Sequence, residues 1–191
     1  MSTTPFPQWC EAAPEAEFSP PGDCAERANA FERRIKRRNL FEYLAGLLIF
    51  AVCGPGAMFA FGKGEFLIAI SLVLMMIGTG IVMWNLHKRG SNLVRRPEDP
   101  CLTHLRRQYQ RQYEALRSVP KWYLGPLVPG MAMFYFVSVA KSAEIDGWAA
   151  ATSGAMVPVL ATIALFGGVA LLNWRGANVL KGKMASLDDL A

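Results

Sequence analysis

Four long apolar stretches constrain this chain more than any other feature of its sequence. They run over residues 40–61, 66–86, 122–140 and 154–174, and none carries a charge in its central part. Each approaches the roughly 20 apolar residues that a helix needs to cross a bilayer core about 30 Å thick. Helices of a soluble bundle would need a polar face, which these stretches lack. We therefore predict an all-α integral membrane protein with four transmembrane helices.

The distribution of lysine and arginine predicts how these helices are oriented. Six of these residues lie before residue 40, nine in residues 87–121 and three after residue 174. The two short connections between spans hold one each, Lys63 and Lys141. Because cytoplasmic loops collect Lys and Arg, we predict that both termini and the long middle loop lie in the cytoplasm.

Side chains typical of a membrane boundary flank the predicted spans. Five of the six residues 33–38 are Lys or Arg, and the first apolar stretch begins directly afterwards at Leu40. Glu42 follows Arg38 by four residues, a spacing that predicts an ion pair on one helix face. Trp and Tyr are also enriched at membrane interfaces. We predict these membrane-edge anchors on the cytoplasmic side: Arg37, Arg38, Tyr43, Trp84, Trp122, Tyr123 and Trp174.

Proline and glycine interrupt the apolar stretches. Gly54-Pro55-Gly56 removes a backbone donor from the first span and leaves two interpretations open, a kinked helix or a broken one. Pro126, Pro129 and Pro158 predict similar bends in the later spans. Small residues allow close approach of helices in membranes, which predicts packing contacts at Gly78, Gly80, Gly167 and Gly168.

Two amphipathic cytoplasmic helices are predicted, over residues 24–39 and 100–118, because apolar residues recur there every three or four positions. Polar residues of the second helix fill its opposite face: Arg106, Arg107, Gln108, Gln110, Arg111 and Gln112. Its apolar stripe could lie on the inner leaflet, pack against the helix at 24–39, or meet another cytoplasmic surface. The predicted partner-binding residues of the two helices are Phe31, Ile35, Leu105, Tyr109, Tyr113 and Leu116.

The two ends of the chain differ in character. Residues 1–23 combine acidic residues and prolines without any Lys or Arg, a composition that predicts a disordered tail. That tail is either a docking motif for a basic partner or inert. Residues 175–191 form a predicted cytoplasmic tail.

Residues that could support catalysis or metal binding are few. Cys101 and His104 stand three residues apart and could supply two metal ligands, but a structural zinc site needs about four. Completing that set would require Cys10, Cys24 or His87, so we predict no metal or cofactor. The four cysteines are widely spaced, and we expect no disulfide framework. Nucleotide-binding and nucleophile motifs are absent from the sequence, which predicts that the chain is not an enzyme.

Three segments carry a resemblance to a known family: "FERRIKRRNLFEYLAG", "LHKRGS" and "LRRQYQRQYEALRSVPKWYLGPLVPGMAMF". Together they resemble a family of small, mostly uncharacterised proteobacterial inner-membrane proteins, and an alphaproteobacterial member in particular. The matching positions are Arg37, Arg38, Asn39, Glu42 and Tyr43, then Arg117, Ser118, Val119, Trp122, Tyr123, Pro126, Pro129 and Gly130. The resemblance implies an association with extracytoplasmic-function sigma factors, and hence an anti-sigma or sensory role.

Two function classes follow from these observations. The first is a regulatory or scaffolding membrane protein whose cytoplasmic helices bind a protein partner, with a sigma factor as the partner that the resemblance implies. The alternative is a small transporter or channel subunit that acts as a homo-oligomer around its glycine-rich faces. Direct binding of nucleic acid is not expected, because the basic residues recur at every predicted cytoplasmic membrane boundary.

Overall fold

The computed structural model describes residues 21–93 and 100–188, and the regular structure within these ranges is entirely helical. The α-helices are α2 (Pro21–Gly62), α3 (Phe66–Gly90), α4 (Cys101–Arg117), α5 (Val128–Asp146) and α6 (Trp148–Asp188). A π-helical turn, η1 (Pro120–Leu124), and a 3-10 turn, η2 (Gly125–Leu127), connect α4 to α5. The predicted all-α fold is confirmed. Of the tail predicted over residues 1–23, residues 1–20 lie outside the described part.

Four helical segments are long and apolar enough to cross a membrane, in agreement with the predicted number of spans: Ala25–Gly62, Phe66–Gly90, Pro120–Asp146 and Trp148–Leu187. Large apolar side chains are exposed along most of their length, beginning at Leu40 in α2 and ending at Trp174 and Val179 in α6. Soluble proteins rarely expose so large a contiguous apolar surface. This surface is that of a multi-pass membrane protein.

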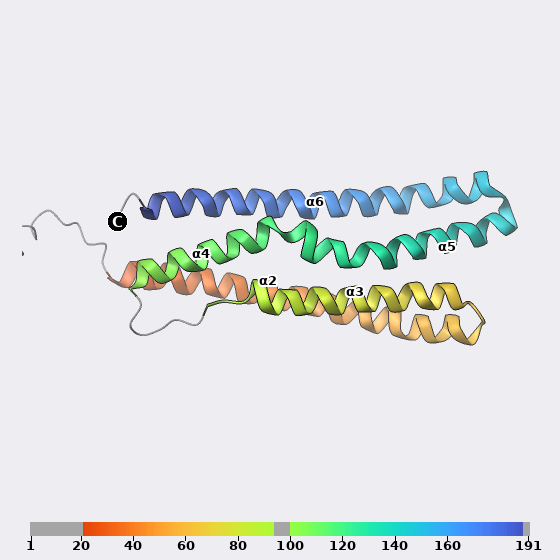
Figure 1. The fold of residues 1–191 in the computed structure, drawn as a ribbon, viewed down its shortest axis with the longest axis horizontal. Helices are drawn as coiled ribbons and strands as arrows, with labels where there is room; N and C mark the ends of the chain where they lie inside the picture. Colours follow the sequence, from red (N-terminus) through yellow and green to blue (C-terminus); the bar gives the residue numbers. More distant parts are fainter. Residues whose placement is uncertain (1–20, 94–99, 189–191) are drawn as a thin grey trace, which may run out of the picture.

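The chain is built from two long helical hairpins that lie side by side (Figure 1). One pairs α2 with α3, and the other pairs α5 with α6. Gly64 and Gly147 lie in the two tight connections with φ of 78° and 81°, a region that favours glycine. Both connections lie at one end of the molecule, and the start of α2 and the end of α6 lie at the other (Figure 1).

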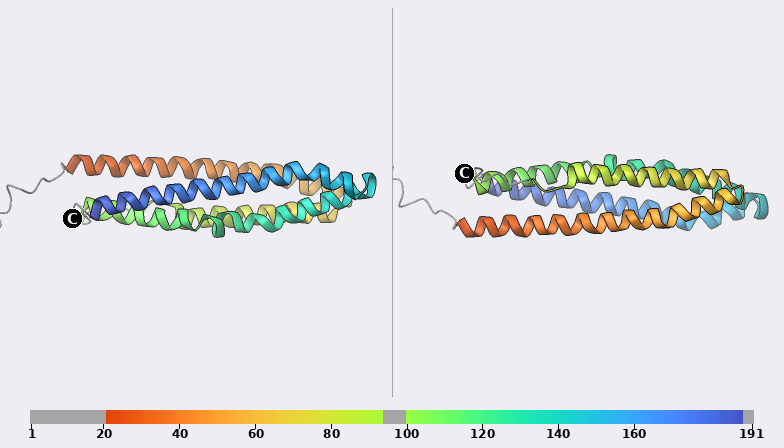
Figure 2. Two further views of the ribbon diagram at one scale, coloured as in Figure 1. Left: turned by 90° about the horizontal axis from the view of Figure 1, so that it is seen from above. Right: turned by 90° about the horizontal axis from the view of Figure 1, so that it is seen from below.

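The helices continue well past the predicted membrane edges. The predicted helix at 24–39 and the span at 40–61 are one continuous helix, α2, and the span at 154–174 continues into the C-terminal residues as α6. Pro55 and Pro158 lie inside these helices, so α2 is not broken at residues 54–56. Instead α2 curves towards α3 near its distal end (Figure 2). The neighbouring helical turns keep their backbone hydrogen bonds, which limits the effect of proline to a bend.

Glycines at one face of α3 let the second hairpin approach closely. A Cβ atom on Gly78 would lie 2.3 Å from the carbonyl oxygen of Pro126, and one on Gly130 would lie 2.6 Å from the backbone nitrogen of Met75. The prediction of close packing is therefore confirmed at Gly78. It is wrong for Gly167 and Gly168 within the described chain, where an added Cβ would meet no atom within 4 Å. Gly167 instead lines a hollow between α5 and α6.

A candidate binding groove beyond the apolar band

Beyond the apolar band, α2, α4 and α6 continue together as a helical cluster with its own core. Ala28, Leu105, Tyr109 and Leu180 form this core, and the ring of Phe31 meets that of Tyr109 edge-on with centroids 4.8 Å apart. The apolar stripe of α4 thus packs against α2, one of the three placements left open by the sequence, and also against α6.

The predicted partner-binding residues are brought together in this cluster, but they differ in accessibility. Ile35, Leu105 and Tyr109 are buried, so their side chains contact the protein's own core. Phe31, Tyr113 and Leu116 are half-buried and pack against that core from outside. This second group therefore presents the larger surface to another molecule.

A groove runs between α2 and α6, with α4 as its floor. It consists of three hollows of about 380, 270 and 230 Å³, ordered from the end of the molecule towards the apolar band. Phe31, Arg34 and Lys183 line both the outer and the middle hollow, while Arg38 and Leu116 line both the middle and the inner one. Neighbouring hollows share these wall residues, and we call the three hollows together the basic groove.

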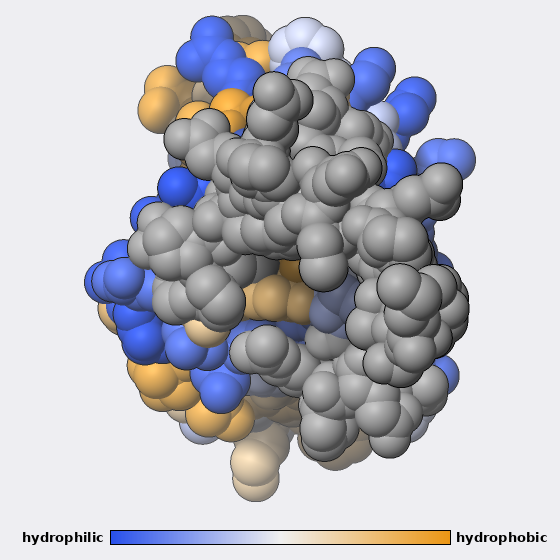
Figure 3. All heavy atoms as spheres, turned by 90° about the vertical axis from the view of Figure 1, so that its left-hand side faces the viewer, coloured by the Kyte–Doolittle hydropathy of each residue, from blue (hydrophilic) through white to orange (hydrophobic). Residues whose placement is uncertain are grey.

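The charges of the basic groove are mostly positive. Arg27, Arg34 and Arg38 recur on one face of α2, and Lys183 faces them from α6, with its Nζ atom 5.9 Å from the centroid of the Tyr109 ring. Neither Arg34 nor Lys183 forms an ion pair with another residue of the described ranges. Viewed from this end, hydrophilic side chains surround the bundle with apolar ones among them (Figure 3). Glu42, at the inner end, is the one acidic residue among the described residues that line the groove.

The environment of Tyr109 reflects its position under the groove. Burial raises the pKa of its hydroxyl above the usual 10.0, and the nearby Arg27 guanidinium opposes that rise. The phenol is therefore held neutral, and the ring offers its face to the ammonium of Lys183.

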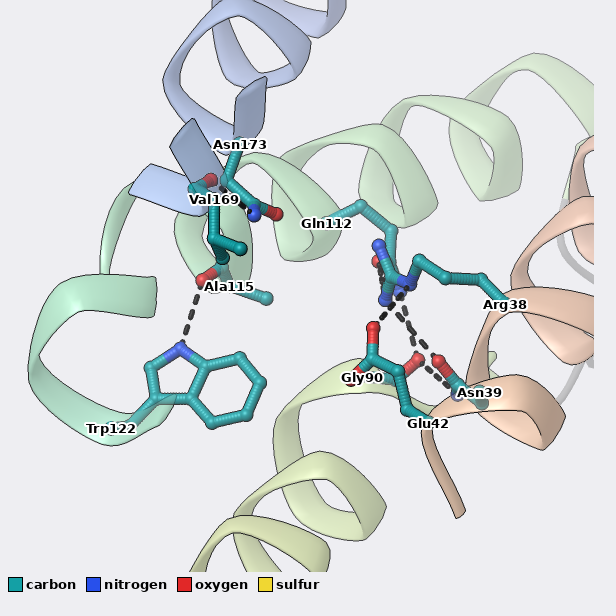
Figure 4. A network of polar contacts seen from close by, with 9 residues as sticks. All are labelled: Arg38, Asn39, Glu42, Gly90, Gln112, Ala115, Trp122, Val169 and Asn173. Carbon is teal, nitrogen blue, oxygen red and sulfur yellow. Dashed lines mark hydrogen bonds and ion pairs between the residues drawn. The ribbon is translucent and has the colours of Figure 1, made fainter. Parts of the chain in front are cut away.

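The inner end of the groove holds a polar cluster (Figure 4). Arg38 and Glu42 form the predicted ion pair, with Nε and Oε1 3.6 Å apart. The guanidinium also donates from Nη2 to Asn39 and to Gln112, over 3.3 and 3.4 Å. Across the hollow, the Trp122 indole donates to the carbonyl of Ala115 over 2.9 Å. The inner hollow is therefore lined by the charged side chains of Arg38 and Glu42 and by the aromatic ring of Trp122.

Two glutamines predicted on the polar face of α4 are instead buried. Gln108 donates to Asn92 and accepts from the backbone N–H of Leu93, while Gln112 donates to the carbonyl of Gly90. Asn39 donates to the same carbonyl over 2.9 Å. The amides of Asn39 and Gln112 thus satisfy a carbonyl at the C-terminal end of α3, where carbonyls lack helical partners, and Gln108 holds the residues that follow. The sequence does contain one signal of this burial. His104, Gln108 and Gln112 follow one another at steps of four residues and none of them is arginine or lysine, although arginines lie between them.

The predicted membrane-edge anchors occupy different environments. Trp84 and Trp174 are exposed, and the Lys88 ammonium lies 4.8 Å from the centroid of the Trp84 ring. Arg37 is exposed as well, while Arg38, Tyr43 and Tyr123 are half-buried. Trp122 is only 7% exposed, so its ring packs inside the protein with Leu86 and Val119.

Cys101 and His104 do not act together. Cys101 is disulfide-bonded, which the wide cysteine spacing did not predict. The Nε2 atom of His104 faces Glu32 Oε1 at 3.5 Å. Within residues 21–93 and 100–188, no cluster of three or more His, Cys, Asp or Glu side chains could hold a metal ion.

No protein-family model, curated protein or solved structure matches this chain. The family resemblance inferred from the motifs at 31–46 and 105–134 thus stays a prediction.

Proposed function

We propose that this chain is a regulatory or scaffolding protein of the bacterial inner membrane whose basic groove binds an acidic segment of a cytoplasmic protein. The observation that carries this proposal is the series of four cations along the groove, Arg27, Arg34, Arg38 and Lys183, against the single acid Glu42. Long grooves of this kind accept an extended or helical segment.

The outer part of the groove lies too far from the bilayer to be a lipid site. Arg34 precedes Leu40, where the apolar band begins, by six residues, which corresponds to about 9 Å of helix, and Arg27 lies about 20 Å out. The headgroup layer is only about 5–8 Å thick on each side of the membrane. A soluble macromolecule is therefore the ligand that can reach Arg27 and Arg34.

The walls of the groove indicate the chemistry of the partner. The guanidinium group of arginine can donate two parallel hydrogen bonds to a carboxylate. Between these charges, the half-buried Phe31 and Leu116 provide apolar contact. A segment that alternates Asp or Glu with apolar side chains complements both features. The resemblance found in the sequence makes a sigma factor the first partner to test.

In this proposal, the distribution of Lys and Arg indicates on which side of the membrane the groove lies. Eighteen Lys and Arg residues on the side of the groove against two on the other support a cytoplasmic groove. The disulfide at Cys101 favours the opposite orientation, because disulfides persist in oxidising compartments. We give the charge bias more weight, because it is repeated in three separate segments of the chain.

Polar side chains inside the spans support this function over transport. Ser71, Thr79 and Thr162 each donate to a backbone carbonyl of their own helix, over 2.7 to 2.9 Å. Hydroxyl groups bonded in this way already have a partner inside the protein, as is typical of helix-packing residues rather than of ligands for a solute.

Site-specific crosslinking tests the proposal. Val179 lines the middle of the groove, so Val179→p-benzoylphenylalanine should crosslink the partner in cells, and the captured peptide should be acidic. Val157, equally on α6 but in the apolar band, gives the matched control, and crosslinking there should capture no cytoplasmic protein. The Lys183→Glu change should remove the Val179 crosslink, whereas Lys181→Glu, outside the groove, should leave it intact.

Three results would overturn the proposal. The first is a captured segment that is neutral or basic, and the second is a crosslink that survives charge reversal at Lys183. The third is a crosslink to the chain's own residues 1–20 or to a second copy in place of a partner.

A further inference from the structure

We infer that the inner end of the groove binds the headgroup of a zwitterionic phospholipid that carries a primary ammonium group. The site is the hollow of about 230 Å³ between α2, η1 and α6, with Arg38, Glu42, Trp122 and Asn173 in its walls. We call it the headgroup pocket. The headgroup pocket shares Arg38 with the groove proposed above for the partner, but Arg27, Arg34 and Lys183 lie outside it.

The headgroup pocket lies at the level of the membrane surface. Arg38 and Glu42 stand on either side of Leu40, where exposure of large apolar side chains begins on α2. Trp122 begins the third predicted span, and Asn173 directly precedes the end of the fourth. Three helical segments thus bring their boundary residues to one place, which is where lipid headgroups lie.

Two buried polar atoms in the pocket lack hydrogen-bond partners within the described chain. These are Nε of Arg38 and Oε2 of Glu42, because the ion pair uses Oε1 of Glu42 at the long distance of 3.6 Å. Buried polar atoms in folded proteins are nearly always satisfied. One is a donor and the other an acceptor. Both atoms are enclosed by protein in this structure, but the side chains that carry them are 34% and 26% exposed, so a small shift of each would let one ligand with a phosphate oxygen and an N–H group satisfy the two together.

The charge balance of the pocket selects among phospholipids. Arg38 and Glu42 carry opposite charges, which suits a zwitterion better than an anion. A glycerol headgroup has no cation to place beside the Glu42 carboxylate, and a choline headgroup has no N–H to donate. The apolar wall of Leu116, Val119 and Leu172 would contact the glycerol and the first methylene groups.

Native mass spectrometry of the purified full chain tests this assignment. The protein is titrated with phosphatidylethanolamine, phosphatidylcholine and phosphatidylglycerol of identical acyl chains. We expect phosphatidylethanolamine to bind about tenfold more tightly than the other two, the factor that one charge-assisted hydrogen bond can carry. Equal binding of the three lipids, or a preference for phosphatidylglycerol, would overturn the inference.

Point variants distinguish the contact of Arg38 with the phosphate from the contact of Glu42 with the ammonium group. Glu42→Gln should abolish the preference for phosphatidylethanolamine over phosphatidylcholine, and Arg38→Gln should weaken both. Arg37→Gln, an exposed cation at the same level that does not line the pocket, should change neither. A preference that is unchanged in Glu42→Gln protein would contradict the ammonium contact even though the wild-type protein selects this lipid.

A soluble ligand with the same chemistry is tested in parallel. Free phosphoethanolamine, added at the concentration of the lipid, should not displace bound phosphatidylethanolamine, because the apolar wall contributes to binding. Displacement at equal concentration would show that the pocket recognises a soluble phosphoamine rather than a lipid, and would overturn the lipid assignment.

Discussion

The backbone of Pro126 lies directly against Gly78, so that a Cβ atom on this glycine would stand 2.3 Å from the Pro126 carbonyl oxygen. The contact joins the two helical hairpins in the part of the molecule that crosses the membrane. Because the obstructing atom belongs to the backbone, a flexible side chain cannot move aside to make room.

We therefore expect Gly78→Ala to lower the free energy of unfolding by roughly 1–3 kcal/mol, the usual cost of overpacking. Thermal unfolding in detergent measures the effect. Gly80→Ala is the matched control two residues away, where the nearest atom to an added Cβ, Cζ of Phe50, is 3.9 Å distant. Equal stability of the two variants would contradict the close approach of the hairpins.

The buried amide of Gln112 provides a second test. Gln112 is 1% exposed, and it bonds both the Gly90 carbonyl and the Arg38 guanidinium. Gln112→Ala leaves that guanidinium with one acceptor fewer, and we expect a loss of about 1–3 kcal/mol in unfolding free energy. Gln110→Ala, on the exposed face of the same helix, should stay within about 0.5 kcal/mol of wild type. If the two substitutions cost the same, Gln112 does not hold the end of α3.

We expect Trp122 to stabilise the fold through its indole N–H as well as through the packing of its ring. Trp122→Phe keeps an aromatic ring but removes the 2.9 Å bond to the Ala115 carbonyl, and should cost about 1 kcal/mol of unfolding free energy. That carbonyl also accepts a longer bond from Ser118, which limits the loss. Trp148→Phe is the control. Because Trp148 is 64% exposed, this substitution should change the fluorescence of the protein but not its stability.

Alkaline pH should loosen the cluster of α2, α4 and α6. Since burial raises the pKa of Tyr109 above 10.0, its contribution to stability is complete below the unfolded pKa near 10. That contribution is lost as pH rises through the higher folded value. We expect the wild-type protein to lose stability over this alkaline range and Tyr109→Phe to lose less. Tyrosinate absorbance during the titration shows whether the transition belongs to Tyr109, and identical pH profiles for both proteins would contradict its burial.

Membrane orientation is tested with topology reporters. Fusions at residues 64 and 146, in or beside the two tight connections, should both report the periplasmic side. A fusion at residue 188, at the end of α6, should report the cytoplasm. A cytoplasmic signal at either connection would disprove the orientation on which the proposed function depends.

Much of the architecture could be predicted from residue order alone. The four spans follow from apolar length, because a helix in lipid must satisfy its backbone internally and thus needs no information from distant residues. The ion pair of Arg38 and Glu42 was predictable for the same reason, since it joins two turns of one helix.

Contacts between helices were harder to predict. Gly78 and Gly167 belong to similar small-residue motifs, yet only the first meets another backbone. Lipid is as apolar as the side chains that face it, so hydropathy does not separate a helix face that packs from one that lipid covers. Gln108 and Gln112 were assigned to a solvated face because their polarity is visible in the sequence, whereas their partners at and just after the end of α3 are not.

Residue order alone specifies how many helices are long and apolar enough to cross a membrane and where the charges gather, because hydrophobicity and charge act locally along each helix. Packing between the helices is what brings Arg27, Arg34 and Lys183 to one groove and places Arg38, Glu42, Trp122 and Asn173 around one pocket. Those assemblies depend on how far α2 and α6 extend beyond the apolar band and on which faces α4 holds together. Both are set by packing between residues that lie far apart in the chain.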